Sequence, residues 1–280
     1  SPLVLNRVAI VADAQLENNS AMDLARILHS QGFGSRAECR ALVASGRVRV
    51  DGRRCVDWAE QFEAAGLVFS VDGVFWHHRE AAYLALHKPG GYECSHRPQH
   101  HPSVYSLLPL PLIRRGVEAV GRLDADTTGL LLLSDDGGFV HRYTSPRKLV
   151  EKVYELRTRH AVDDGQVEAL LAGVTLRDEA LPVAAVSCQR LDDRHLRLSV
   201  TLGRYHLVKR MLAAVGNRVE SLHRVAIGGL VLPPELRVGE WMWLEAVDLE
   251  RLAAGGSSAA TAGGLRHGGH AAMEGAPGSS

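Results

Sequence analysis

The N-terminal part of the chain shows helical spacing followed by alternation of polar and apolar residues. Apolar residues within 24–28 lie three and four positions apart, as on one face of a helix. Ser35-Arg36-Ala37-Glu38 has the form of a capping box and predicts the start of a second helix. Arginine and valine alternate over 47–50, and the Asp-Gly pair at 51–52 predicts a hairpin that returns along 53–56. The pattern predicts a helix–helix–hairpin module whose first hairpin arm has its arginines on one face.

From residue 82 onward, short apolar runs alternate with helical patterns, without the regular period of βαβ units. Helices are predicted over 164–172, before Gly173, and over 206–215, before Gly216. No dinucleotide-binding glycine fingerprint or phosphate-binding loop is present in the sequence. The predicted strands are 82–88, 130–134, 150–159, 183–191 and 196–202. We therefore expect an α+β fold with a mixed, largely antiparallel sheet.

Composition narrows the class of protein. The 280 residues are 46% hydrophobic and 23% charged, which is an ordinary globular balance. No apolar run approaches the roughly 20 residues of a membrane-spanning helix. The four cysteines are far apart and lack metal-ligand spacing, which indicates reduced thiols. We expect a cytoplasmic protein with no membrane partner and no metal site.

Lysine and arginine balance aspartate and glutamate at 32 each, but the charges are unevenly distributed. Residues 21–58 hold seven arginines and four acids, 141–159 hold six basic residues and two acids, and 201–224 hold five and one. Residues 163–194 have the opposite balance, with seven acids and three arginines. Such segregation is typical of a basic binding face and an acidic back, although solvated surfaces without a shared function would produce the same counts.

The patterns divide the chain into four parts. Residues 1–20 form an N-terminal extension without an assigned element, and 21–78 form the small module. Residues 79–252 form the larger domain. Residues 253–280 consist mainly of Gly, Ala and Ser, so we expect a disordered tail.

The most informative segment is a polar loop at 121–129 that leads into the apolar run 130–133. A loop anchored beside a buried strand suits a reactive group that must be held in place. Asp124, Asp126, Thr128, Gly129 and Asp135 fall on calcium-loop positions, but a leucine occupies a ligand position and no suitable helix follows. Paired carboxylates would also fit glycoside hydrolysis, and two aspartates that only cap turns would fit as well.

Several motifs, in order, resemble pseudouridine synthases of the ribosomal small-subunit (RsuA) type over residues 22–250. The central one is Gly121-Arg122-Leu123-Asp124-Ala125-Asp126-Thr127-Thr128-Gly129-Leu130. Others include Leu86-His87-Lys88-Pro89-Gly90-Gly91, Thr144-Ser145-Pro146-Arg147, Glu151-Lys152-Val153-Tyr154 and Gly203-Arg204-Tyr205-His206-Leu207-Val208-Lys209-Arg210-Met211, and shorter matches lie at 94–95 and within 213–229. The N-terminal module resembles the α-L RNA-binding domain shared with a small-subunit ribosomal protein.

The resemblance implies isomerisation of uridine to pseudouridine in structured RNA, without a cofactor. Asp124 matches the catalytic aspartate, which attacks either the ribose or the base. Lys209 matches the basic residue of the later motif and is the expected cation beside Asp124. Tyr154 matches the tyrosine that stacks on the target base, which must be extruded from the RNA.

A helical wheel supports this interpretation independently. Over 206–215, the apolar residues share one face, whereas His206, Lys209 and Arg210 fall on the opposite side. We expect RNA contacts from cations on this helix, on the catalytic loop, on the strand before Tyr154 and on the module. The RNA-binding candidates are Arg122, Arg36, Arg40, Arg47, Arg49, Arg53, Arg54, Lys152, Arg204, His206 and Arg210.

Two positions depart from the family pattern: Leu207 replaces a common glutamine, and His87 replaces the usual asparagine. Neither change affects the three catalytic candidates. The expected partner is 16S ribosomal RNA, free or in a partly assembled small subunit, bound by a monomeric enzyme. The alternatives are a 23S rRNA pseudouridine synthase of the same family and a non-catalytic RNA-binding assembly factor.

Overall fold

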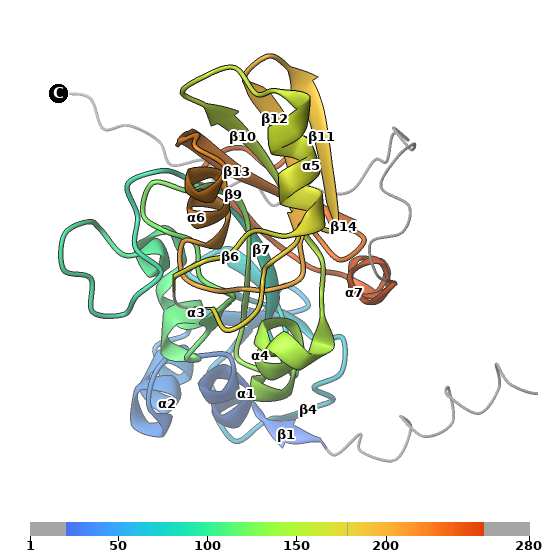
Figure 1. The fold of residues 1–280 in the computed structure, drawn as a ribbon. Coiled ribbons are helices and arrows are strands. Elements are labelled where there is room, and N and C mark those ends of the chain that lie inside the picture. The colour runs from blue at the N-terminus through green and yellow to red at the C-terminus, as the bar shows by residue number, and fades with distance from the viewer. Residues whose placement is uncertain (1–20, 178, 255–280) are drawn as a thin grey trace, which may run out of the picture.

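A computed structural model describes residues 21–177 and 179–254, so the predictions for 1–20 and for the tail beyond Ala254 lie outside the described residues. Figure 1 shows a small N-terminal unit beside a larger one built on a long twisted sheet. Within the described residues, no helix is long and apolar enough to cross a membrane.

The N-terminal unit has the predicted helix–helix–hairpin order. Asp23 caps its first helix, and Ser35 and Glu38 form the predicted capping box of the second. The hairpin joins a four-stranded sheet of order β3-β2-β5-β6, and a separate two-stranded sheet pairs β1 with β4. The elements are β1 (Met22–Asp23), α1 (Leu24–Ser30), α2 (Arg36–Ala44), β2 (Val48–Val50), β3 (Arg53–Cys55), β4 (Gln61–Phe62), β5 (Val68–Val71) and β6 (Val74–His77).

The larger unit is a nine-stranded sheet of order β11-β12-β10-β13-β9-β7-β15, with β14 on β13 and β8 on β9. Its pairings are antiparallel except between β9 and β13, which confirms the predicted α+β fold with a mixed, largely antiparallel sheet. The strands are β7 (Tyr83–Lys88), β8 (Glu118–Val120), β9 (Thr128–Ser134), β10 (Lys152–Thr158), β11 (Ser187–Asp192), β12 (His195–Val200), β13 (Val219–Ile227), β14 (Leu230–Val231) and β15 (Trp241–Trp243).

Apolar layers cover both faces of this sheet, which explains the continuous leucine run 130–133. Leu131 and Leu133 belong to the main core, whereas Leu130 and Leu132 belong to a second core on the other face. Other strands, connecting loops and helices supply the remaining core residues, and seven helical elements of the described chain accompany the sheet. They are η1 (Val104–Leu107), α3 (Leu110–Arg114), α4 (Gly137–Thr144), η2 (Pro146–Lys148), α5 (Asp164–Ala172), α6 (Leu207–Ala214) and α7 (Ala246–Ala253).

Buried hydrogen bonds join the module to the sheet. The Gln31 side chain exchanges hydrogen bonds with the backbone of Arg79 and accepts one from Arg115 at 2.9 Å. The Arg115 side chain, which is 4% exposed, also pairs with Asp135 at 2.7 Å. Because these groups are buried and mutually satisfied, they fix the orientation of the N-terminal module relative to the larger unit.

The sequence missed one central strand and misplaced the start of another. Strand β13 was not predicted, because Glu220, His223 and Arg224 interrupt its apolar pattern. Strand β11 begins at Ser187 rather than at residue 183, because Val183 instead forms an isolated bridge with Val174.

Candidate active site

Two buried cations hold the polar loop 121–127 in place between β8 and β9. The Lys88 ammonium donates to the carbonyls of Pro89, Ala125 and Thr127 at 2.8–3.1 Å. Arg224 is 1% exposed, and its guanidinium donates to the carbonyls of Leu130 and Gly121 at 2.8 and 3.1 Å. The loop is therefore preorganised by side chains from β7 and β13.

A close approach between β9 and β13 fixes the end of the same loop. Gly129 has φ +104°, and a Cβ there would lie 2.3 Å from the carbonyl oxygen of Arg224. Only glycine fits this contact without separating the two parallel strands.

Asp124 lies at the centre of a charged cluster between this loop and the start of α6. Its Oδ2 is 3.1 Å from the Lys209 ammonium, and its Oδ1 is 3.3 Å from Nε2 of His206. The Asp124 side chain is 22% exposed, so the carboxylate is sheltered but accessible. The structure thus brings together the predicted aspartate and its predicted cation.

Asp126, to which the sequence assigned no catalytic role, shares the same ammonium. The Lys209 Nζ lies 2.7 and 2.9 Å from the two Asp126 carboxylate oxygens. Partial burial is the largest influence on the pKa of Asp126 and raises it, but the hydrogen bond and charge of Lys209 outweigh burial and leave the pKa below its ordinary value. Burial likewise acts first to lower the pKa of Lys209, and the two carboxylates reverse that effect, so its pKa is raised. Lys209 is therefore a charged bridge between two aspartates.

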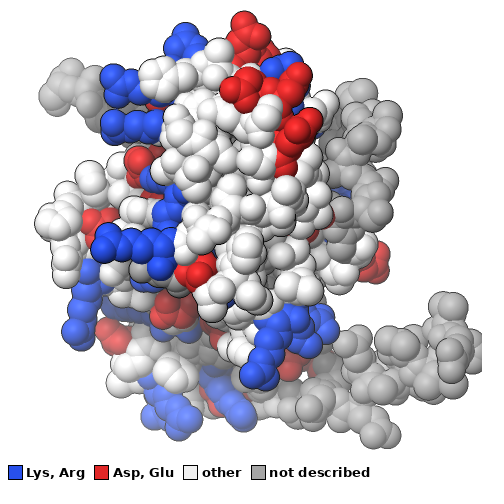
Figure 2. All heavy atoms as spheres, in the orientation of Figure 1, with Lys and Arg blue, Asp and Glu red and all other residues white. Residues whose placement is uncertain are grey.

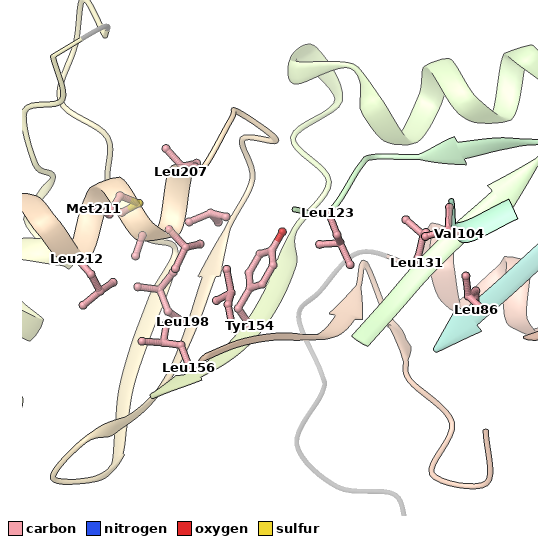
Figure 3. Close-up of a cluster of buried hydrophobic side chains, with 14 of the residues drawn as sticks. Leu86, Val104, Leu123, Leu131, Tyr154, Leu156, Leu198, Leu207, Met211 and Leu212 are labelled. Atoms are coloured by element: carbon pink, nitrogen blue, oxygen red, sulfur yellow. The ribbon is translucent and has the colours of Figure 1, made fainter. Parts of the chain in front are cut away.

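Tyr154 lies in the main core beside this cluster. Figure 3 shows its ring between a group that contains Leu198 and Leu207 on one side and Leu123 on the other. The residue is 9% exposed and is held by β10, whose neighbours are β12 and β13. It lies beside Leu123, the residue before Asp124, so the predicted tyrosine is close in the fold to the predicted aspartate.

Lys152, two residues earlier on β10, is buried rather than placed at the surface as an RNA contact would require. It is 6% exposed, and its ammonium lies 2.8 Å from the carbonyl of Val150 and 3.5 Å from that of Thr201. Burial, with a smaller contribution from the charge of Arg224, lowers the pKa of Lys152 to about 8. The structure favours a structural role for this lysine.

This burial predicts a pH-dependent stability. Between about pH 8 and 10.5, Lys152 loses its proton in the folded protein but keeps it in the unfolded chain. The unfolded state then binds more protons, so the free energy of unfolding rises with pH, by up to about 3 kcal/mol from this group. Chemical denaturation across this range should show the rise in the wild type but not in Lys152→Met. The exposed Lys148→Met is the control, and an unchanged slope in Lys152→Met would contradict the assignment.

The four predicted hairpin arginines differ in their partners. Arg47 forms an ion pair with Asp72, and Arg53 forms one with Glu60. Two other arginines have no acidic partner among the contacts of the described residues: the guanidinium of Arg49 donates to the Gly52 carbonyl, and that of Arg54 to the Ser45 carbonyl. Arg49 and Arg54 are therefore more available to contact RNA phosphates than Arg47 and Arg53.

The remaining predicted RNA contacts lie on two surfaces. On the module, Arg36 and Arg40 are exposed on α2, and the Arg40 guanidinium lies 4.3 Å from the ring centre of Trp58. Near the site, Arg122 is exposed in the catalytic loop. In the view of Figure 2, basic side chains lie along the left edge and at the bottom, and several acidic side chains lie together at the upper right.

Arg204 and Arg210 both pair with Glu179, a partner that the sequence did not predict. The Glu179 side chain is 5% exposed, so these two cations flank a buried carboxylate beside the site. No local pattern reveals this contact, because Glu179 comes from a loop distant in sequence.

The calcium-loop alternative is wrong. Thr128 and Gly129 begin strand β9, and Asp135 pairs with Arg115. No cluster of three metal-ligating side chains occurs among the described residues. The carboxylates that remain, at 124 and 126, share the Lys209 ammonium.

Comparison with known proteins agrees with this geometry. Residues 82–214 match the family model described as RNA pseudouridylate synthase, and residues 23–57 match the S4 domain. The ribosomal small subunit pseudouridine synthase A of Haemophilus influenzae is 35% identical over 218 residues, covering 78% of this chain and 94% of that protein. The protein of the same name from Pseudomonas aeruginosa is 36% identical, covering 81% of this chain and 99% of its own.

A solved structure supports the same conclusion. A crystal structure of a pseudouridylate synthase shares 33% identity and a TM-score of 0.58, covering 82% of this chain and 99% of that one. The fold and site therefore define an isomerase that acts on RNA. The chain belongs to the RNA pseudouridylate synthase family and combines its domain with an S4 domain.

The two departures from the family motifs lie away from open solvent. Leu207 is 4% exposed and packs in the main core, which explains how an apolar residue is tolerated there. His87 is partly buried, with Nδ1 2.8 Å from the carbonyl of Leu236.

Proposed function

We propose that this protein converts one uridine of small-subunit (16S) ribosomal RNA to pseudouridine, with Asp124 as the nucleophile. The observation that carries the proposal is the contact of the sheltered Asp124 carboxylate with Lys209 and His206, on a loop held by two buried cations. The choice of 16S rRNA is supported by the names of relatives that match most of the chain.

In this reaction the bond between C1′ of the ribose and N1 of uracil breaks, and a bond between C1′ and C5 forms. The proton at C5 leaves and N1 gains one, so no atom is lost overall. The Lys209 ammonium contacts the Asp124 carboxylate and orients it for attack on the ribose or the base. Tyr154 forms the wall against which the extruded uracil stacks.

The two units have separate tasks in this proposal. The module, residues 21–78, binds RNA through cations that include Arg36, Arg40, Arg49 and Arg54. Residues 79–252 carry out the isomerisation, and Arg122 occupies the space left by the extruded nucleotide. The buried hydrogen bonds of Gln31 and Arg115 hold the two units in one orientation. We propose that the protein acts as a monomer.

Release of tritium from carbon five of labelled uridine tests the RNA class. Transcripts of 16S and 23S rRNA and partly assembled small subunits are incubated separately with the enzyme. We expect stoichiometric release from 16S rRNA, alone or in the particle, and none from 23S rRNA. Release from 23S rRNA alone would identify the alternative synthase.

The non-catalytic alternative predicts tight RNA binding without release from any of these RNAs. Salt dependence alone does not separate the two functions, because both predict that affinity falls steeply as salt rises. Only an enzyme requires Asp124, whose carboxylate would repel a nearby phosphate.

A further inference from the structure

An exposed aromatic ring stands at the edge of the catalytic cluster, without an assigned role. Tyr205 is 74% exposed, although it lies directly before His206. The Tyr205 and His206 rings are stacked, with centroids 3.7 Å apart and planes 20° from parallel. Because the imidazole covers one face and most of the residue is exposed, the second face of the tyrosine ring is open to solvent.

The backbone beneath this ring is held by charged side chains. Arg204, the preceding residue, pairs with the buried Glu179. The Arg210 guanidinium lies 3.5 Å from the Tyr205 carbonyl and 3.6 Å from a Glu179 carboxylate oxygen. An exposed ring on an anchored backbone loses little freedom when a planar ligand stacks on it.

The stack is connected to the reactive group. His206 adopts φ +48°, a left-handed conformation that non-glycine residues rarely adopt, at the start of α6. Its Nε2 lies 3.3 Å from Asp124, so one imidazole contacts both the Tyr205 ring and the carboxylate. A ligand on the open face of the tyrosine would therefore extend a stack that ends beside Asp124.

We propose that Tyr205, backed by His206, forms a stacking site for an unpaired RNA base next to the extruded uridine. This inference rests on the proposed function and names a contact within it. A nucleobase is favoured over an aliphatic group because bases stack on aromatic rings, and because the neighbouring cluster belongs to a member of a family that acts on RNA. The site would hold the strand in register after the uridine has left its stack.

Variants at residue 205 separate stacking from other roles of the tyrosine. Tyr205→Leu removes the ring, and Tyr205→Phe keeps the ring while removing the hydroxyl. We expect Tyr205→Leu to weaken RNA binding and raise KM about 5- to 150-fold, with less than about threefold change in kcat. Tyr205→Phe should resemble the wild type, and both variants should keep the wild-type melting temperature because the residue is exposed.

A fluorescent base identifies the stacked position. Fragments of 16S rRNA carry 2-aminopurine on either side of the target uridine, and binding is read from its fluorescence. One of the two positions should be quenched by wild type and Tyr205→Phe but not by Tyr205→Leu. Phe75→Leu, which removes an aromatic ring of 70% exposure from β6 of the module, is the matched control and should leave this quenching unchanged.

The test distinguishes failure of this inference from failure of the proposed function. RNA affinity and quenching that do not differ between Tyr205→Leu and wild type would overturn the stacking site, whether or not the enzyme turns over. Loss of binding in Tyr205→Phe as well would assign the effect to the hydroxyl and also overturn it. Absence of tritium release by the wild type would overturn the proposed function instead.

Discussion

Asp124→Asn is expected to lower the single-turnover rate of isomerisation by at least about 10³-fold, because it replaces the nucleophile with an amide of nearly the same shape. RNA affinity should change less than about threefold, since the side chain is 22% exposed and makes its contacts within the protein. Rapid mixing with tritium-labelled RNA gives the rate, and filter binding of the same RNA gives the affinity.

Asp126→Asn is the matched control for this variant. It removes the same charge from the same loop and from the same lysine, but the Asp126 side chain is 72% exposed. We expect its rate to stay within about tenfold of the wild type. Equal losses in the two variants would mean that the cluster acts only through its total charge, and a larger loss in Asp126→Asn would reverse the assignment.

Lys209→Met is expected to lower kcat/KM about 10²- to 10³-fold, the effect of removing one preorganised charge from an active site. The substitution leaves two aspartates without the ammonium that lies 3.1 Å from Asp124 and 2.7 Å from Asp126. Lys209→Arg retains a cation and should lose less activity. Steady-state kinetics on 16S rRNA measure both variants.

A second substitution separates charge from packing at Lys209. If the lysine acts by balancing two carboxylates, Asp126→Asn should recover part of the activity of Lys209→Met, because one unpaired negative charge is then removed. Activity of Lys209→Met within threefold of the wild type would contradict the role of the lysine. If Asp126→Asn recovers none of the activity that Lys209→Met loses, Lys209 acts mainly by positioning α6.

The sequence predicted the fold best where local pattern and burial agree. The Ser35 capping box, the hairpin at Asp51-Gly52 and the run 130–133 all have local causes, and the structure contains all three elements. Strand β13 escaped prediction because polar residues interrupt its apolar pattern, and one of them is buried by contacts across the sheet. Arg224 is the clearest case, since its guanidinium is satisfied by carbonyls more than 90 residues away.

In the candidate site as well, local motifs predicted some residues, whereas residues placed by distant contacts were missed. Motif resemblance supplied Asp124, Tyr154 and Lys209, and the structure places all three in or beside one cluster. The side chains that hold the loop in place come from positions distant in the sequence, so no local pattern predicts their contacts. Lys88, which donates a hydrogen bond to the Thr127 carbonyl, is an example. Lys152 illustrates the opposite error: strand alternation places it on the same side as Tyr154, but does not show that this side is buried.

The most direct test of the central claim is the nucleoside content of 16S rRNA after incubation with the enzyme. Pseudouridine has the same mass as uridine, so the digested RNA is separated by chromatography. We predict that wild type converts one uridine per RNA molecule to pseudouridine and that Asp124→Asn, at equal RNA occupancy, converts none. Pseudouridine formed by Asp124→Asn at the wild-type rate, or RNA bound by the wild type without any conversion, would contradict the account.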